Sequence, residues 1–135
     1  MAVNRGISGK ALSQETTHYG APVVVFKQAS TTSAGTTETK AIFDGNAPFR
    51  FRVIRAWIHL TEAALGDSED VKLTDGSNDI TEVLDYAAGA DNDSFEFSNY
   101  DNAYSTIDKG GSLKAVKTAT TAISSFDLYV MAVRV

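Results

Sequence analysis

The sequence of 135 residues contains no cysteine, and this absence removes several kinds of site at once. A chain without thiols has no disulfide scaffold, no thiol nucleophile, and no zinc or iron–sulfur site built on thiolates. Histidine is almost as scarce, with only His18 and His59 in the whole chain. Any catalytic triad or histidine-based metal site must therefore use one of these two residues.

Basic residues are also few, because 12 lysines and arginines stand against 17 aspartates and glutamates and give a formal net charge of -5. A protein that holds a phosphate backbone normally presents a basic face, so this balance argues against a nucleic-acid partner. The chain has no run of about 18 apolar residues, the length that a membrane helix needs. Its first residues lack the apolar core of a signal peptide. We expect no membrane partner and synthesis in the cytoplasm.

Motifs for catalysis and cofactor binding are missing as well. The sequence has no G-x-S-x-G elbow, phosphate-binding glycine loop, dinucleotide fingerprint or H-E-x-x-H pattern. The acidic stretches 75–79 (DGSND) and 91–96 (DNDSFE) hold closely spaced oxygen ligands, but neither has the spacing of a calcium loop. Turn chemistry accounts for both stretches, and calcium binding stays an open alternative. The sequence predicts a protein that is not an enzyme and that has no cofactor and no metal.

What the chain does contain is a series of short β-rich stretches separated by turn-forming residues. They lie at 21–29, 41–45, 48–60, 71–86, 95–97, 106–116 and 124–135, and the stretch 71–86 is predicted to form two strands around a turn at 75–78. No amphipathic helix longer than two turns is visible. Seven to nine strands separated by turn signals predict one all-β domain over residues 21–135, a jelly-roll-like or Greek-key β-sandwich.

The stretch 48–60, PFRFRVIRAWIHL, changes its alternation partway along. One face first carries Phe49, Phe51 and Val53. Beyond Val53 the apolar residues fall on the other parity, at Ile54, Ala56, Ile58 and Leu60. A slip of one residue is what a β-bulge produces, or a strand that bends from one sheet into another. We therefore expect a bulge or such a bend after Val53, with Arg55, Trp57 and His59 together on the remaining face.

Three interpretations of the face that carries Arg55, Trp57 and His59 stay open, and the simplest is that it is an ordinary part of the core. Trp57 could be a stacking platform for a sugar or a single-stranded nucleic acid, with arginines as charge partners. Protein interfaces are also enriched in tryptophan, tyrosine and arginine, and we favour an interface. The final stretch 124–135 is apolar on both parities, which predicts a strand covered on both faces. Both features predict a homo-oligomer.

The first 20 residues are polar and carry only scattered apolar residues. These are Val3, Ile7, Leu12 and Tyr19. Their spacing fits no regular element, so we expect an extended N-terminal arm over residues 1–20. Such an arm can span up to about 65 Å and reach a neighbouring subunit, where the four apolar residues would be buried.

Four stretches carry a resemblance to a known group of proteins: APFRFRVIRAWIHLT, VKLTDGSNDITEVLD, NAYSTIDKGGSLKAV and the final strand. Together, over about Ala47 to Val135, they resemble the small β-sandwich virion proteins of tailed bacteriophages that are assigned as capsid decoration, or cement, proteins. The resemblance implies a jelly-roll-like domain, often trimeric, on the exterior of the capsid. There it would bind the major capsid protein and tie neighbouring capsomers together.

A different class of function remains as the alternative. A carbohydrate-binding or host-attachment β-sandwich of a tail or fibre would also be non-enzymatic and virion-associated. It would need an exposed aromatic platform. Tyr86, Tyr100 and Tyr104 flank loops where such a platform could form.

Overall fold

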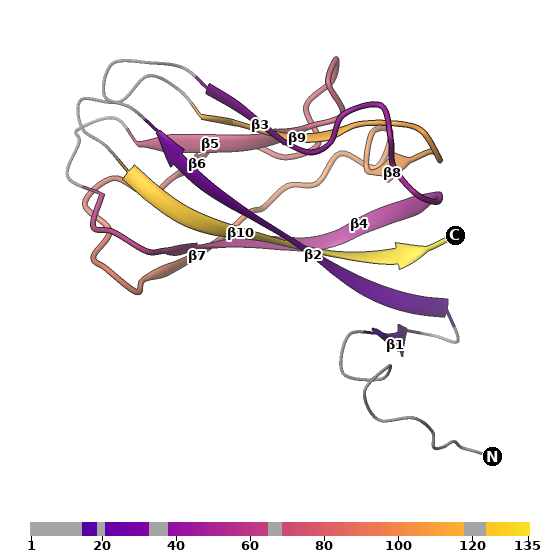
Figure 1. The fold of residues 1–135 in the computed structure, drawn as a ribbon, viewed down its shortest axis with the longest axis horizontal. Coiled ribbons are helices and arrows are strands. Elements are labelled where there is room, and N and C mark those ends of the chain that lie inside the picture. The colour runs from indigo at the N-terminus through magenta and orange to yellow at the C-terminus, as the bar shows by residue number, and fades with distance from the viewer. Residues whose placement is uncertain (1–14, 19–20, 33–37, 65–68, 118–123) are drawn as a thin grey trace.

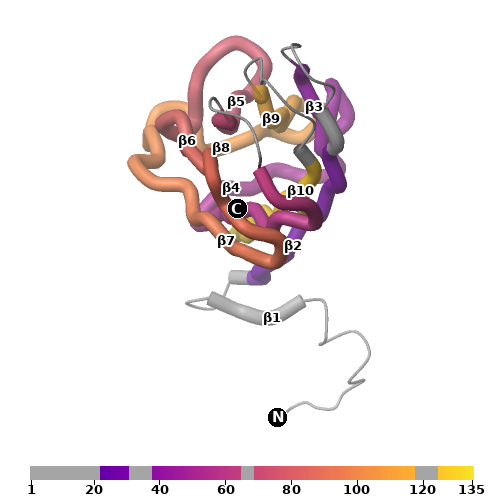
Figure 2. The backbone as a smooth tube through the Cα atoms, turned by 90° about the vertical axis from the view of Figure 1, so that its left-hand side faces the viewer, coloured from indigo at the N-terminus to yellow at the C-terminus, as the bar shows by residue number. Residues whose placement is uncertain are grey.

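The computed structural model describes residues 15–18, 21–32, 38–64, 69–117 and 124–135. These residues form ten β-strands and no helix, so the described part of the chain has no helix that could cross a membrane. The strands make two antiparallel sheets that lie one above the other (Figures 1 and 2). The predicted all-β sandwich is therefore confirmed. The predicted arm residues Val3, Ile7, Leu12 and Tyr19 lie outside the described residues.

The lower layer in Figure 1, here called sheet A, has the strand order β1-β2-β10-β4-β7, and β8 pairs with β4 beside this path. Its strands are β1 Glu15–His18, β2 Ala21–Thr32, β4 Phe51–Leu60, β7 Ser94–Glu96, β8 Thr106–Ile107 and β10 Ser124–Arg134. Strand β1 falls within the stretch predicted as an arm and pairs with the start of β2. For residues 1–14 the arm stays a prediction.

The upper layer, sheet B, has the strand order β3-β9-β5-β6. Its strands are β3 Glu38–Phe43, β5 Asp70–Thr74, β6 Leu84–Asp85 and β9 Leu113–Lys117. The antiparallel pairs are nested along the chain, since β2 pairs with β10, β3 with β9, β4 with β7 and β5 with β6. Earlier strands of the chain thus pair with later strands, from the outermost pair inward, and the pairs are shared between the two sheets.

The core lies between the two sheets and is built from the side chains that alternate inward. One end holds a cluster of four phenylalanines, Phe26, Phe43, Phe49 and Phe51, whose ring centroids lie 4.9 to 6.3 Å apart. Towards the other end, the buried Tyr86 packs edge-on against Phe126 at 5.7 Å. Burial of each large apolar side chain stabilises the fold by about 1.5–3 kcal/mol.

The bulge predicted in the stretch 48–60 is confirmed. Met131 on β10 pairs with Arg55, whereas the next residue, Ala132, pairs with Val53, so Ile54 has no partner on β10. The inward side chains change parity across this point: Phe51 and Val53 are buried before it, and Ala56, Ile58 and Leu60 are buried after it. Ile54, expected to begin the second apolar set, is instead the half-buried extra residue of the bulge.

Strand β10 is covered more fully on one face than on the other. Its inward residues Phe126, Leu128, Val130 and Ala132 are all buried. On the opposite face Val133 is buried, but Tyr129 and Met131 are only half-buried. Within one chain, the strand predicted to be covered on both faces therefore keeps part of its second face open to solvent.

The predicted turn at 75–78 is confirmed in detail. The carboxylate of Asp75 accepts hydrogen bonds from the backbone N–H of Ser77 at 2.8 Å and of Asn78 at 2.6 Å. Gly76 has a φ of 101°, a conformation that favours glycine. The strand after this turn is shorter than predicted, because regular pairing resumes only at β6.

Candidate functional site

The most distinctive surface of the molecule is the outer face of sheet A, the face directed away from sheet B. One row of register partners crosses four strands of this face and consists of Lys27, Tyr129, Trp57 and Glu96. A second row consists of Ala29, Asp127, His59 and Ser94, and a third of Val25, Met131 and Arg55. The structure thus brings Arg55, Trp57 and His59 to one face, where the sequence placed them.

The two aromatic rings of the first row stack on each other. The Trp57 and Tyr129 rings are nearly parallel, at an angle of 11°, with their centroids 5.4 Å apart. The Arg55 guanidinium carbon lies over the Trp57 ring at 4.9 Å, and Lys27 Nζ lies over the Tyr129 ring at 5.6 Å. These four residues form what we call the cation–aromatic stack.

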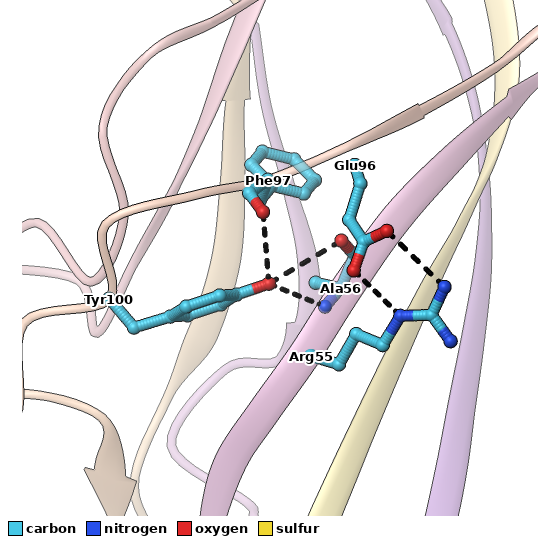
Figure 3. Close-up of polar contacts among 5 residues, drawn as sticks. All are labelled: Arg55, Ala56, Glu96, Phe97 and Tyr100. Atoms are coloured by element: carbon cyan, nitrogen blue, oxygen red, sulfur yellow. Dashed lines mark hydrogen bonds and ion pairs between the residues drawn. The ribbon is translucent and has the colours of Figure 1, made fainter.

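Each cation of the stack is also held by a carboxylate. Arg55 Nε donates to Glu96 Oε1 at 2.7 Å, and Arg55 Nη2 donates to Glu96 Oε2 at 3.2 Å (Figure 3). This hydrogen-bonded pairing raises the pKa of Arg55 and lowers the pKa of Glu96. Lys27 Nζ lies 3.7 Å from Asp127 Oδ2. Exposed pairs of this kind add little stability, so their main effect is to fix where the cations lie.

The strand order fixes the neighbours of each ring. Trp57 on β4 lies between β10, which carries Tyr129, and β7, whose Glu96 holds Arg55. Tyr129 on β10 lies between Trp57 on β4 and Lys27 on β2. Each ring therefore has the other ring and one cation as its neighbours.

Tyr100 fixes the backbone of β4 next to the bulge. Ala56 N–H donates to the Tyr100 hydroxyl at 2.7 Å, and this hydroxyl lies 3.4 Å from the carbonyl oxygen of Phe97 (Figure 3). The contact falls beyond the end of β7, which pairs with β4 only from Trp57 to His59. Burial raises the pKa of Tyr100. The hydroxyl takes the place of a strand neighbour and helps to position Arg55.

His59 completes the set of residues predicted on this face. It is half-buried, and its Nδ1 lies 3.1 Å from the Ser94 hydroxyl on the neighbouring strand β7. A shallow open groove beside the stack is lined by Arg55, Trp57, Ser94, Phe95 and Glu96. His59 has register partners on both neighbouring strands, Asp127 on β10 and Ser94 on β7, so it does not lie on an edge strand. Its place in a subunit contact stays a prediction.

The acidic stretches show no cluster of metal ligands. Within the described residues, no group of three or more histidines, aspartates or glutamates is arranged to hold a metal ion. The Asp75 carboxylate is occupied by the turn described above, and Asp93 Oδ2 accepts a hydrogen bond from the backbone N–H of Ala90 at 2.8 Å. The calcium alternative therefore gains no support from these loops.

The aromatic platform needed by the attachment alternative is not formed by the three tyrosines considered for it. Tyr86 is fully buried, and Tyr100 is half-buried with its hydroxyl on β4. Tyr104 is 38% exposed. The sequence placed these residues beside loops, but it did not show that Tyr86 points into the core, where it packs against Phe126.

Sequence reasoning missed two buried charged residues at one end of the core. Lys117 is fully buried, with Nζ 4.8 Å from the centre of the Phe126 ring, and burial lowers its pKa to about 8 although Glu69 and Glu38 act to raise it. Glu69 is 1% exposed, and neither of its carboxylate oxygens accepts a hydrogen bond from any residue in the described ranges. One signal was available, because Lys117 continues the inward parity of Leu113 and Ala115.

Comparisons of the chain with models of known protein families, with curated protein sequences and with solved structures found no match.

Proposed function

We propose that the chain is a non-enzymatic virion structural protein of the capsid decoration, or cement, type, with the outer face of sheet A as its protein-contact surface. It would bind the major capsid protein on the capsid exterior, as a homo-oligomer, with a trimer favoured, and tie neighbouring capsomers together. The observation that carries the contact surface is the cation–aromatic stack, in which each ring contacts the other ring and a cation.

This stack suits a protein partner better than a sugar. A sugar that stacks on an aromatic residue needs a free ring face, whereas each ring here already contacts the other ring and a cation. Next to the stack lie the half-buried Met131 and Val25, which is 46% exposed. Aromatic residues, methionine and arginine are the residues enriched at protein interfaces. The surface therefore offers apolar area with a charged rim.

The arrangement of the strands also supports the proposal. Nested antiparallel pairs wound into two sheets support a jelly-roll arrangement, and viral capsid domains are among the proteins built on jelly rolls. The sequence resemblance to decoration proteins covers about Ala47 to Val135, which includes β4, β7 and β10 of the contact surface. Because lectin domains share the same architecture, the fold alone does not separate the two functions.

Binding to capsid shells tests the proposal. Purified chain is mixed with empty shells assembled from the major capsid protein of the same genome, and co-sedimentation is measured. Trp57→Ala should weaken binding by tenfold or more, about 1.4 kcal/mol, because it removes the centre of the stack. Tyr104→Ala is the matched control, since it removes an exposed aromatic residue outside the three rows and should leave binding unchanged.

Arg55→Glu provides a second variant in case Trp57→Ala weakens the fold. It should also release the chain from shells, because it places a like charge beside Glu96. The proposal is overturned if both variants bind shells like the unchanged chain. It is also overturned if the chain ignores shells but binds glycans in an array, and a loss of that binding in Tyr104→Ala would favour the attachment module.

A further inference from the structure

Among the described residues, strand β2 has one edge that is unpaired along most of its length. It contains 12 residues, and on the side away from β10 it pairs with β1 only from Ala21 to Val24. Between Val25 and Thr32, no strand of the described residues pairs with that side. Eight residues of β2 therefore carry backbone N–H and C=O groups that alternate between the β10 ladder and this edge.

The devices that usually protect an edge strand are nearly absent here. Proteins blunt such edges with proline, bulges, very short strands or several charges. The proline of β2, Pro22, lies in the part already paired with β1, and the ladder from Val23 to Thr32 runs along β10 without a shift in register. Lys27 is the one charged residue of the open segment. The edge has the properties of a strand that accepts a partner.

The chain supplies a segment of the right length at the right place. In the register of β1, Glu15 lies opposite Val24, and the chain then runs backwards along the open edge of β2. Continuing this register sets Gln14 opposite Val25 and Leu12 opposite Lys27. Ile7 would then lie opposite Thr32. Residues 7–14 thus match the open segment residue for residue.

The sequence of residues 9–14 fits the two sides of the edge. In this stretch, GKALSQ, small and long side chains alternate, and the alternation does not extend to Ile7 and Ser8. In the continued register the small ones, Gly9, Ala11 and Ser13, take the inward parity, on the side where Gln28 Nε2 donates to the carbonyl oxygen of Ala41 on β3 at 2.9 Å. Space is limited there because β3 lies close. The long ones, Lys10, Leu12 and Gln14, take the outward parity, which is open.

We infer that residues 7–14 dock on the open edge of β2 of the same chain as a strand that continues β1 in its register. Sheet A then gains one strand, and Leu12 lies beside Lys27 at the end of the cation–aromatic stack. The same chain is the source because β1 already fixes Glu15 opposite Val24, and this tether gives a high effective concentration. Only residues 1–6 are then left to reach a neighbouring subunit. The inference does not depend on the proposed function.

Engineered cysteines test the docking and its register, since the chain has no cysteine of its own. The double variant Leu12→Cys with Lys27→Cys should form an intramolecular disulfide under mild oxidation, seen as a faster monomer on a non-reducing gel. The matched control is Ala11→Cys with Lys27→Cys. Its side chains would lie on opposite faces of the sheet, where a disulfide cannot close.

Each other outcome overturns the inference. Disulfide-linked dimers as the main product, at low protein concentration, would assign the edge to a second copy. Equal linkage in both double variants would show that the segment has no fixed register on β2. No linkage in either variant would show that the segment does not dock on this edge.

Hydrogen exchange gives a readout without cysteines. Leu12→Pro in the full chain removes a ladder donor, so alternate amides of Val25–Thr32 should exchange about tenfold faster or more. Val3→Pro, outside the docking segment, should leave these rates unchanged. Equal rates in Leu12→Pro and the unchanged chain would contradict the docked strand.

Discussion

The two faces of sheet A are built by the same strands and have different chemistry. The inner face is apolar and closed, with Ala56, Ile58, Leu128 and Val130 at 0–1% exposure. The outer face carries rings that are covered by cations and left half open to water. The inner face stabilises the fold by excluding water, whereas the outer face holds a fixed arrangement of rings and charges at the surface. We propose that this arrangement serves contact with a partner.

The contrast extends to two lysines that each lie over an aromatic ring. Lys27 lies over Tyr129 on the outer face, and Lys117 lies over Phe126 between the sheets. Lys27 has a largely exposed side chain, whereas Lys117 is fully buried. The same contact is therefore a surface feature in one case and a buried charge with a desolvation cost in the other.

The largest expected difference between the two faces of sheet A is found at two neighbouring residues of β10. Leu128→Ala should lower the free energy of unfolding by about 3 kcal/mol, because it leaves a cavity in the core. Tyr129→Ala, one residue further on and on the outer face, should cost about 1 kcal/mol through loss of its stacked partner. Urea unfolding of the purified chain measures both values. If Tyr129→Ala costs as much as Leu128→Ala, the outer face is part of the core and the contrast fails.

The next effect concerns pH and the buried Lys117. Its folded pKa of about 8 is below the ordinary value of about 10.4, so the fold is penalised while this lysine is charged. The penalty is complete below pH 8 and is relieved as the pH rises towards 10. The free energy of unfolding should therefore increase over this range, by a value on the order of 2 kcal/mol.

Two variants separate this lysine from the others. Lys117→Met should abolish the rise in stability between pH 8 and 10, and Lys27→Met on the outer face should retain it. Urea unfolding at several pH values gives the comparison. A rise of equal size in Lys117→Met would show that another group causes it.

The smallest effect concerns the support of the bulge. Tyr100→Phe removes the acceptor of the Ala56 N–H and should cost about 1 kcal/mol, the usual value for one hydrogen bond. The measurement is made below pH 9, where tyrosines stay protonated. Tyr104→Phe is the control and should cost less. Equal stability of Tyr100→Phe and the unchanged chain would mean that the hydroxyl has no structural role.

Local alternation in the sequence predicted the strand β4, its bulge and the common face of Arg55, Trp57 and His59. It could do so because side-chain parity depends only on neighbours along the chain. The partners Lys27, Tyr129 and Glu96 were not predictable in this way, since they come from three other strands. Their register is decided by packing between segments that are far apart in sequence.

The buried charges show a different limit. The alternation of β9 predicts that Lys117 points inward, but lysine is rarely buried, so its residue type predicts the opposite. The structure buries it because the core extends to that end of the sheets, which the sequence alone does not show. In the same way, the loop position of Tyr86 suggested exposure, whereas its contact with Phe126 places it inside.

The position of β10 in sheet A has a consequence for how the chain is made. This strand lies between β2 and β4, yet it follows every other described strand in the sequence (Figure 1). A chain still emerging from the ribosome has β2 and β4 but lacks the strand that joins them. Sheet A can close only after synthesis has passed Arg134, and pairing over such long separations is slow. Until then the facing edges of β2 and β4 are open to wrong partners, including other nascent copies.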